Sequence, residues 1–171
     1  MAENQHKYQM AIHDFQIARQ RAAVQEVLAR VTGKSNQLLS YEEVAEKLKL
    51  RARTERGLQN IPLDAVVGSV GRYTDFTRTF LPRHANDQQR WAGVKTAIES
   101  GEGLPPIDVY KVGEVYFVVD GNHRVSIARQ EGFSTIQARV IEFQTAINLT
   151  PDIQPDGRIL LLRRYFNGHI L

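Results

Sequence analysis

Residues 115–132, VYFVVDGNHRVSIARQEG, contain the strongest local signals in the chain. This stretch opens with a run of apolar and aromatic residues, which is typical of a buried β-strand. Polar residues and a glycine come next, and apolar residues then recur with helical spacing until Gly132, a residue type that often follows the last turn of a helix. The stretch therefore predicts a strand, a tight turn at Gly121 and a helix.

The turn between this strand and this helix has the composition of an anion-binding site. The first N–H groups of a helix lack partners, and the helix dipole adds positive potential at the same place. Gly121 lets the chain turn tightly and a ligand approach closely. Arg124 offers a planar fork for phosphate oxygens, and His123 offers a donor whose charge changes near neutral pH. With Asn122 beside them, these residues predict a phosphate-binding turn.

Two residues of the turn are also candidates for catalysis. Asp120 stands at the end of the strand, where it could hold a magnesium ion or accept a proton from a substrate hydroxyl. His123 could take the same role of base. The alternative is purely structural, because Asp-Gly-Asn is common turn chemistry, Asn122 is a good helix cap, and Arg124 can simply pair with Asp120.

The surrounding segments predict a small α+β domain. Residues 61–67 read as a first strand, and residues 107–112 and 115–119 as a hairpin through Gly113 and Glu114. Residues 135–143 alternate as a further strand, and residues 86–100 have a helical apolar stripe. We expect a small mixed sheet with helices over 61–143, preceded by a helical extension over 1–60 and followed by a docking tail over 144–171.

The loop GRYTDFTRTFLPR, residues 71–83, interleaves three arginines with aromatic residues. Arg72, Arg78 and Arg83 in such a pattern suit phosphates and stacked bases. An ordinary packed loop, with its aromatics in the core and its arginines in water, fits the same pattern. Both interpretations stay open at this point.

The N-terminal third is predicted to be helical and basic. Apolar spacing predicts a helix over residues 6–32, ending at Gly33, and Ser40 is placed to cap a short second helix. The tract KLKLRARTERGL, residues 47–58, holds five basic residues and one acid, which could contact DNA or could be an ordinary solvated surface. The long helix could serve a homodimer, and Ile159–Leu162 in the tail is expected to dock on the core.

Composition sets the limits on function. The chain has 171 residues, a net charge of +3 and no cysteine, so disulfides, thiolate metal sites and a cysteine nucleophile are excluded. No apolar run is long enough to cross a bilayer, and the N-terminus lacks the pattern of a secretion signal. We therefore expect a cytoplasmic protein with no membrane partner.

Four segments together resemble the ParB/sulfiredoxin superfamily. They are IPLDAVV (61–67), PPIDVY (105–110), VYFVVDGNHRVSIARQEG (115–132) and TIQARVIEF (135–143), which span about half of the chain. The resemblance implies a small α+β fold that binds nucleotide phosphates at the strand–turn–helix. ParB proteins bind and hydrolyse CTP while clamping on DNA, sulfiredoxins use ATP, and a related branch phosphorylates free serine with ADP.

The resemblance also implies roles for single residues. Gly121 and Arg124 match the phosphate-binding glycine and arginine of the family's turn, and His123 matches the histidine of the sulfiredoxin and serine-kinase branches. Asn122 stands where sulfiredoxin has its reactive cysteine, so sulfinic-acid repair is excluded. Asp120 resembles the aspartate of the kinase-like branch.

The expected ligand is accordingly a nucleoside di- or triphosphate with Mg²⁺. The first function that we infer is a ParB-like nucleotide-binding domain, acting as an NTPase or a nucleotide switch. The alternatives are a small-molecule phosphotransferase and a DNA-binding or nuclease-like module.

Overall fold

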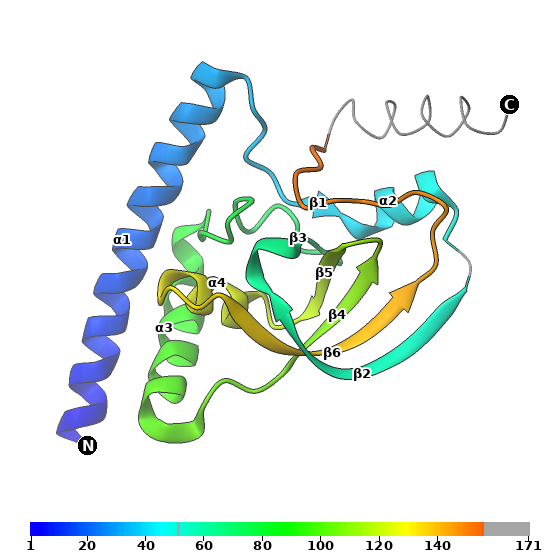
Figure 1. The fold of residues 1–171 in the computed structure, drawn as a ribbon. Helices are drawn as coiled ribbons and strands as arrows, with labels where there is room; N and C mark the ends of the chain where they lie inside the picture. The colour runs from blue at the N-terminus through cyan, green and yellow to red at the C-terminus, as the bar shows by residue number, and fades with distance from the viewer. Residues whose placement is uncertain (51, 156–171) are drawn as a thin grey trace, which may run out of the picture.

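The computed structural model describes residues 1–50 and 52–155, in which helices pack around one mixed six-stranded sheet (Figure 1). The strand order in the sheet is β1-β3-β5-β4-β6-β2. The strands are β1 (Leu39–Ser40), β2 (Arg53–Pro62), β3 (Val66–Ser69), β4 (Ile107–Val112), β5 (Val115–Asp120) and β6 (Thr135–Phe143). The helices are α1 (Ala2–Thr32), α2 (Tyr41–Leu48), α3 (Gln88–Ala97) and α4 (Asn122–Gln130). The α+β class expected from the sequence is confirmed.

The strand–turn–helix of residues 115–132 lies at the centre of this sheet. β5 pairs antiparallel with β4 and parallel with β3, and β4 pairs parallel with β6. Successive side chains of a strand point to opposite faces. Tyr116 and Val118 accordingly enter one hydrophobic cluster, while Val115 and Phe117 enter another. Because both faces of β5 are covered, its sequence is a continuous apolar run rather than an alternation.

The expected first strand over residues 61–67 is wrong in its bounds. Residues 61 and 62 end β2, a 3₁₀ turn spans Leu63–Ala65, and β3 begins only at Val66. β2 is an edge strand that pairs antiparallel with β6, and most of its residues are exposed. An edge strand exposed on both faces has no hydrophobic alternation, so its sequence gives no strand signal. The expected boundary at residue 60 therefore falls inside a strand of the core sheet.

The N-terminal helices form much as expected. α1 ends at Gly33, whose φ of 70° places it in the left-handed conformation, and the Ser40 side chain accepts a hydrogen bond from the Glu43 N–H at 3.4 Å. α1 lies along α3, as Figure 1 shows. Its buried contacts are made by Ala11, Phe15, Ala18 and Ala22.

A buried lysine fixes α1 to the domain. The Lys95 ammonium on α3 lies within hydrogen-bonding distance of Asp14 on α1, 2.8 Å from Glu131 after α4, and 3.7 Å from Glu99. Burial lowers the pKa of Lys95, but the hydrogen bonds to Asp14 and Glu131 outweigh it and raise the pKa above its ordinary value. This charged cluster joins three helical segments.

The first part of the C-terminal tail packs on the core. Leu149 and Ile153 are buried in the cluster around Leu39 and Phe117, and the Glu114 N–H donates to the Leu149 carbonyl at 2.8 Å. Ile159–Leu162, which we expected to dock, lies outside the described residues. Within residues 1–50 and 52–155, no helix has the length and apolar character needed to span a membrane.

Candidate functional site

The predicted phosphate-binding turn lies where β5 ends and α4 begins. β3 and β5 are parallel, so their carboxyl ends meet at the same edge of the sheet. Asp120 ends one strand there, and Arg72 lies three residues beyond Ser69, the end of the other. Crevices outside the carboxyl ends of parallel strands are common ligand sites in sheets with helices on their faces. The sheet topology thus brings the arginine loop and the turn together.

Gly121 is required by its surroundings. Its φ is 112°, a conformation that residues with a side chain rarely adopt. A Cβ atom at this position would lie 2.4 Å from Ile107 Cγ2 and 2.9 Å from Ile107 Cβ. The glycine therefore allows the chain to pass directly over β4 and enter α4 at once.

The first turn of α4 has N–H groups available for a ligand. The Val125 N–H bonds to the Gly121 carbonyl at 3.0 Å and begins the helical pattern. No side chain caps the start of α4 among the described residues. Asn122 does not act as the expected cap, since its buried amide oxygen accepts a hydrogen bond from Ser69 Oγ at 3.0 Å. The N–H groups of residues 122–124 thus lie at the positive end of the helix dipole without a side-chain acceptor.

A pocket of about 180 Å³ opens in front of this helix start. Three arginines from three different elements line it: Arg72 after β3, Arg90 on α3 and Arg124 on α4. The remaining lining residues are Val94, Val119, Asp120, Gly121, Asn122 and His123. Asp120 is the one carboxylate among these residues, so the pocket as a whole is positively charged.

The three arginines are held differently. Arg124 Nη2 lies 2.7 Å from Asp120 Oδ2, and its Nη1 donates to the Pro106 carbonyl at 2.7 Å. Arg72 Nε lies 2.7 Å from Asp75 Oδ2. Arg90 is exposed and makes no hydrogen bond or ion pair to the part of the chain that the structure describes. It is the arginine with most freedom to reach an anion.

His123 differs from the expectation. Its ring is buried, its edge meets Phe76 at a centroid distance of 5.4 Å, and neither ring nitrogen has a hydrogen-bond partner among the described residues. Burial, followed by the positive charges of Arg90 and Arg72, lowers the pKa of His123 to about 4. The expected change of charge near neutral pH is therefore wrong, and the imidazole is neutral at pH 7.

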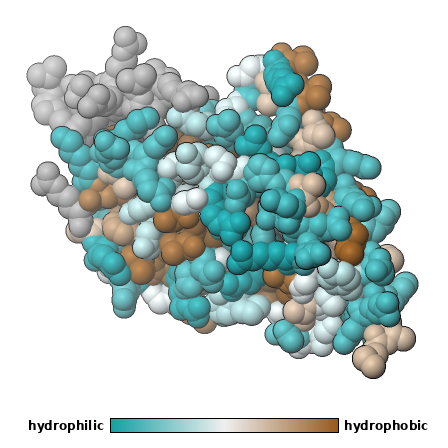
Figure 2. Space-filling view, turned by 180° about the vertical axis from the view of Figure 1, so that it is seen from behind, coloured by the Kyte–Doolittle hydropathy of each residue, from teal (hydrophilic) through white to brown (hydrophobic). Residues whose placement is uncertain are grey.

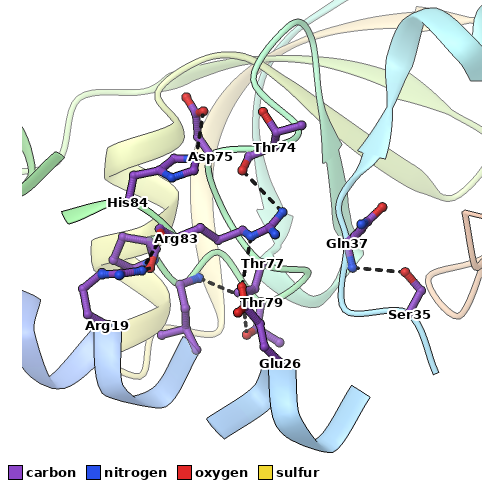
Figure 3. Close-up of polar contacts among 12 residues, drawn as sticks. Arg19, Glu26, Ser35, Gln37, Thr74, Asp75, Thr77, Thr79, Arg83 and His84 are labelled. Atoms are coloured by element: carbon purple, nitrogen blue, oxygen red, sulfur yellow. Dashed lines mark hydrogen bonds and ion pairs between the residues drawn. The ribbon is translucent and has the colours of Figure 1, made fainter. Parts of the chain in front are cut away.

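The other two arginines of the loop lie outside the pocket. The partly buried Arg78 guanidinium donates to the carbonyls of Pro151 and Ile153, at 3.1 and 2.6 Å, and burial lowers its pKa to about 10. Arg83 contacts Glu26 on α1 at 3.3 Å and the Thr74 carbonyl at 3.4 Å, as Figure 3 shows. Both hold the loop to neighbouring segments, so the structure does not bring them to the predicted site.

The aromatics of the same loop are divided in a similar way. Phe76 and Phe80 are fully buried in the main cluster, whereas Tyr73 is exposed. The packed-loop interpretation therefore holds for the two phenylalanines. A row of aromatic side chains for stacked bases is not present in this loop.

The residues present fit an anion better than a metal ion alone. Among the described residues, no group of three or more histidine and carboxylate side chains could hold a metal. Magnesium in nucleotide sites is often held by one or two carboxylates together with substrate phosphates. Asp120 could serve in that way only by giving up part of its contact with Arg124.

Arg90 was not among the residues predicted from the sequence. It stands on the exposed side of a helix next to Trp91, whose indole N–H donates to Ser126 Oγ of α4 at 2.9 Å. That buried contact holds α3 against α4 and so places Arg90 at the pocket. A single arginine on a polar helix face has no local signal that could have identified it.

Part of this chain is similar to a known family and to a solved structure. Residues 76–153 match the family model of the ParB N-terminal domain. The crystal structure of sulfiredoxin from Arabidopsis thaliana is similar to this chain, with 24% sequence identity and a TM-score of 0.39, over 51% of this chain and 86% of that chain. No curated protein matches the chain.

Proposed function

We propose that the chain, whose residues 76–153 match the family model of the ParB N-terminal domain, binds the phosphate groups of a nucleotide in the pocket at the start of α4. The observation that carries the proposal is the convergence of Arg72, Arg90 and Arg124 on an uncapped helix start. These residues come from three separate elements. Only the folded chain creates this concentration of positive charge.

Electrostatics favours a multiply charged ligand. Guanidinium groups bind phosphate oxygens two at a time, and helix N–H groups add donors that are already oriented. Asp120 and Asp75 offset part of the charge of Arg124 and Arg72. A ligand with two or more negative charges would compete with these carboxylates better than a singly charged anion. A di- or triphosphate meets that requirement.

The size of the pocket limits which part of the ligand is enclosed. Pockets that bury a drug-sized molecule usually have volumes of about 300–1,000 Å³. With about 180 Å³, this pocket suits a phosphate end rather than a whole nucleotide. The nucleoside would then lie outside, next to the exposed Val119.

The same residues support binding more directly than group transfer. A general base must accept a proton at the working pH. Asp120 is engaged by Arg124, and the lowered pKa of His123 makes it a weak base. When present, Mg²⁺ would neutralise phosphate charge, with Asp120 as its carboxylate partner. Hydrolysis and phosphotransfer remain the alternative activities, to be tested after binding.

Isothermal titration calorimetry with ATP, ADP, CTP, GTP and pyrophosphate, with and without Mg²⁺, tests the proposal. Arg90→Ala is the most informative variant, because this side chain has no partner whose loss would disturb the described fold. It should weaken binding by about 1.5–3 kcal/mol, the usual contribution of a charge-assisted phosphate contact. Arg30→Ala removes the same charge from outside the pocket and should leave the affinity unchanged. Wild-type protein that gives no heat with any of these ligands would refute the proposal.

DNA binding is a second candidate, favoured by a separate observation. Lys47, Lys49, Arg53 and Arg56 are all exposed around the end of α2 and the start of β2. Such a group can contact phosphates without base specificity, and the affinity would then fall steeply with added salt. In gel-shift titrations over a salt series, Lys47→Ala with Lys49→Ala should reduce the slope of log K against log salt by about 2. A complex that is insensitive to salt would exclude this candidate.

A further inference from the structure

α1 has apolar residues on two opposite faces, and the domain covers only one of them. Ala11, Phe15, Ala18 and Ala22 are buried against the domain. With 3.6 residues per turn, Val24, Val27, Leu28 and Val31 fall on the opposite side of the helix. An amphipathic surface helix normally has one apolar face and one polar face.

The second face is exposed to an unusual degree. Among the described residues, ten large hydrophobic side chains are exposed, and five of them are on α1: Met10, Val24, Val27, Leu28 and Val31. Val31 has the largest exposed fraction of these five, at 78%. Figure 2 shows hydrophobic side chains gathered over the C-terminal end of α1, at the upper right of that view. Exposed apolar side chains gathered in this way, from Val24 to Val31, mark an interaction surface.

The spacing of these side chains indicates what covers them. Met10, Ile17, Val24 and Val31 recur every seven residues, and Val27 lies three residues after Val24. This is the a and d pattern of a coiled coil, with Met10, Ile17, Val24 and Val31 at a positions and His13, Gln20 and Val27 at d positions. We propose that two copies of this chain associate through a parallel two-stranded coiled coil formed by α1.

The a positions have side chains that occur in two-stranded coiled coils. Parallel dimers combine β-branched residues at a with leucine at d, and Ile17, Val24 and Val31 supply the β-branched a residues of that combination, while Val27 takes a d position. His13 and Gln20 are polar d residues, so the contact is strongest from Val24 to Val31. The half of the helix–helix contact that lies toward the N-terminus of α1 is therefore the weaker one.

The positions that flank the seam agree with a second copy. In a parallel pair, a g residue of one helix lies near the e residue that follows it in the other helix. Gln16 would meet Arg21 of the second copy, and Ala23 would meet Leu28. No two like charges meet in these pairs, and the exposed Leu28 gains an apolar neighbour.

The domain lies along one flank of the proposed seam, where Arg21 at an e position donates to Gln130 at 2.8 Å and Ile17, Gln20 and Val24 line a groove with Thr79 and Leu81. The buried residues of α1 occupy the b and f positions of the same heptads, which point away from a coiled-coil axis. The two domains would therefore lie on the outer sides of the helix pair. The proposed dimer does not involve the anion pocket, so its test does not depend on whether the chain binds a nucleotide.

Sedimentation equilibrium of the full chain over a range of concentrations tests the proposal. The wild type should dimerise, and Val24→Glu with Val31→Glu should raise the dissociation constant by about 100-fold or more, because unpaired charges would be buried at the seam. Leu28→Glu should also weaken the dimer. Leu58→Glu is the matched control, since Leu28 and Leu58 are both 54% exposed, and it should have no effect. Circular dichroism confirms that each variant is folded.

A chain without cysteine allows the orientation to be tested as well. Val31→Cys places one thiol at an a position, where the two copies meet across the axis of a parallel pair. It should form a disulfide-linked dimer rapidly under mild oxidation, whereas Leu58→Cys should not. Gln20→Leu should lower the dissociation constant of the dimer relative to the wild type, because it places an apolar side chain at a d position that is polar in the wild type. A monomer at every concentration, a dimer indifferent to the seam variants, or no cross-link through Val31→Cys would each overturn the proposal.

Discussion

The Arg124 guanidinium lies 2.7 Å from the carboxylate of Asp120, so the arginine at the proposed phosphate site is already paired with an acid. The same side chain donates to the carbonyls of Pro105 and Pro106. These contacts fix the position of the guanidinium before any ligand arrives. An anion that enters the pocket would therefore meet a preorganised donor, but it would compete with Asp120 for the Arg124 guanidinium.

Asp120→Asn should strengthen phosphate binding in the absence of Mg²⁺. The change removes a negative charge from the pocket and releases Arg124, and an exposed ion pair of this kind contributes up to about 1 kcal/mol, or roughly fivefold in affinity. Calorimetry with pyrophosphate measures the effect. A loss of affinity confined to titrations with Mg²⁺ would instead show that Asp120 holds the metal.

Gly121→Ala should destabilise the fold by about 2–3 kcal/mol. The new methyl group would overlap Ile107 and the backbone conformation would be strained, which are two separate costs. Urea unfolding measures the change. Gly132→Ala provides the control, because φ is 79° there but nothing lies within 4 Å of a Cβ atom, so only the strain of about 1 kcal/mol is expected. Equal losses of unfolding free energy in the two variants would contradict the expected overlap with Ile107.

Stability should fall as the pH is lowered, partly because of His123. Its folded pKa of about 4 lies below the unfolded value of 6.5, so between these values the unfolded chain takes up a proton that the folded chain does not. His123 does not lower the free energy of unfolding above pH 6.5, and it lowers this free energy by about 3 kcal/mol below pH 4. His123→Phe should remove this part of the pH dependence.

Urea unfolding at a series of pH values from 7 to 4 measures this effect as a difference between wild type and variant. His6→Phe changes an exposed histidine and serves as the control. If the free energies of unfolding of wild type and His123→Phe ran parallel over this range, the imidazole could not be buried in the neutral form.

Lys95→Met should destabilise the protein by about 2 kcal/mol and loosen α1. The substitution removes charge-assisted hydrogen bonds and leaves Asp14, Glu99 and Glu131 facing one another. Hydrogen exchange should accelerate in α1 before it does in β5. Lys7→Met breaks the exposed pair with Glu3 and should cost at most about 0.5 kcal/mol.

The local elements could be predicted wherever the sequence has its own signal. The strand over 135–143, the hairpin turn at Gly113 and the end of α1 at Gly33 are all confirmed. Each depends on alternation, helical spacing or a glycine with positive φ. β2 could not be predicted, because hydrogen bonds to β6, rather than burial of its own side chains, hold this exposed edge strand in the extended conformation.

The candidate site was predictable only in part. The DGNHR turn was found from its composition, but Asn122 turns inward to Ser69, and the ring of His123 is buried against Phe76. Arg78 and Arg83 resembled Arg72 in the sequence, yet they hold the loop to the tail and to α1. Arg90 had no sequence signal and lines the pocket.

Local sequence contains the signals for the turn at Gly121, for the helix and strand on either side of it, and for the seven-residue repeat along α1. These follow from backbone conformation and periodicity, which depend on neighbours along the chain. The packing of the folded chain establishes which arginines meet at the pocket, that His123 is neutral, and which face of α1 is left uncovered. Burial and electrostatic potential depend on neighbours in space, and residues 72, 90 and 124 become neighbours only when β3, α3 and α4 pack together.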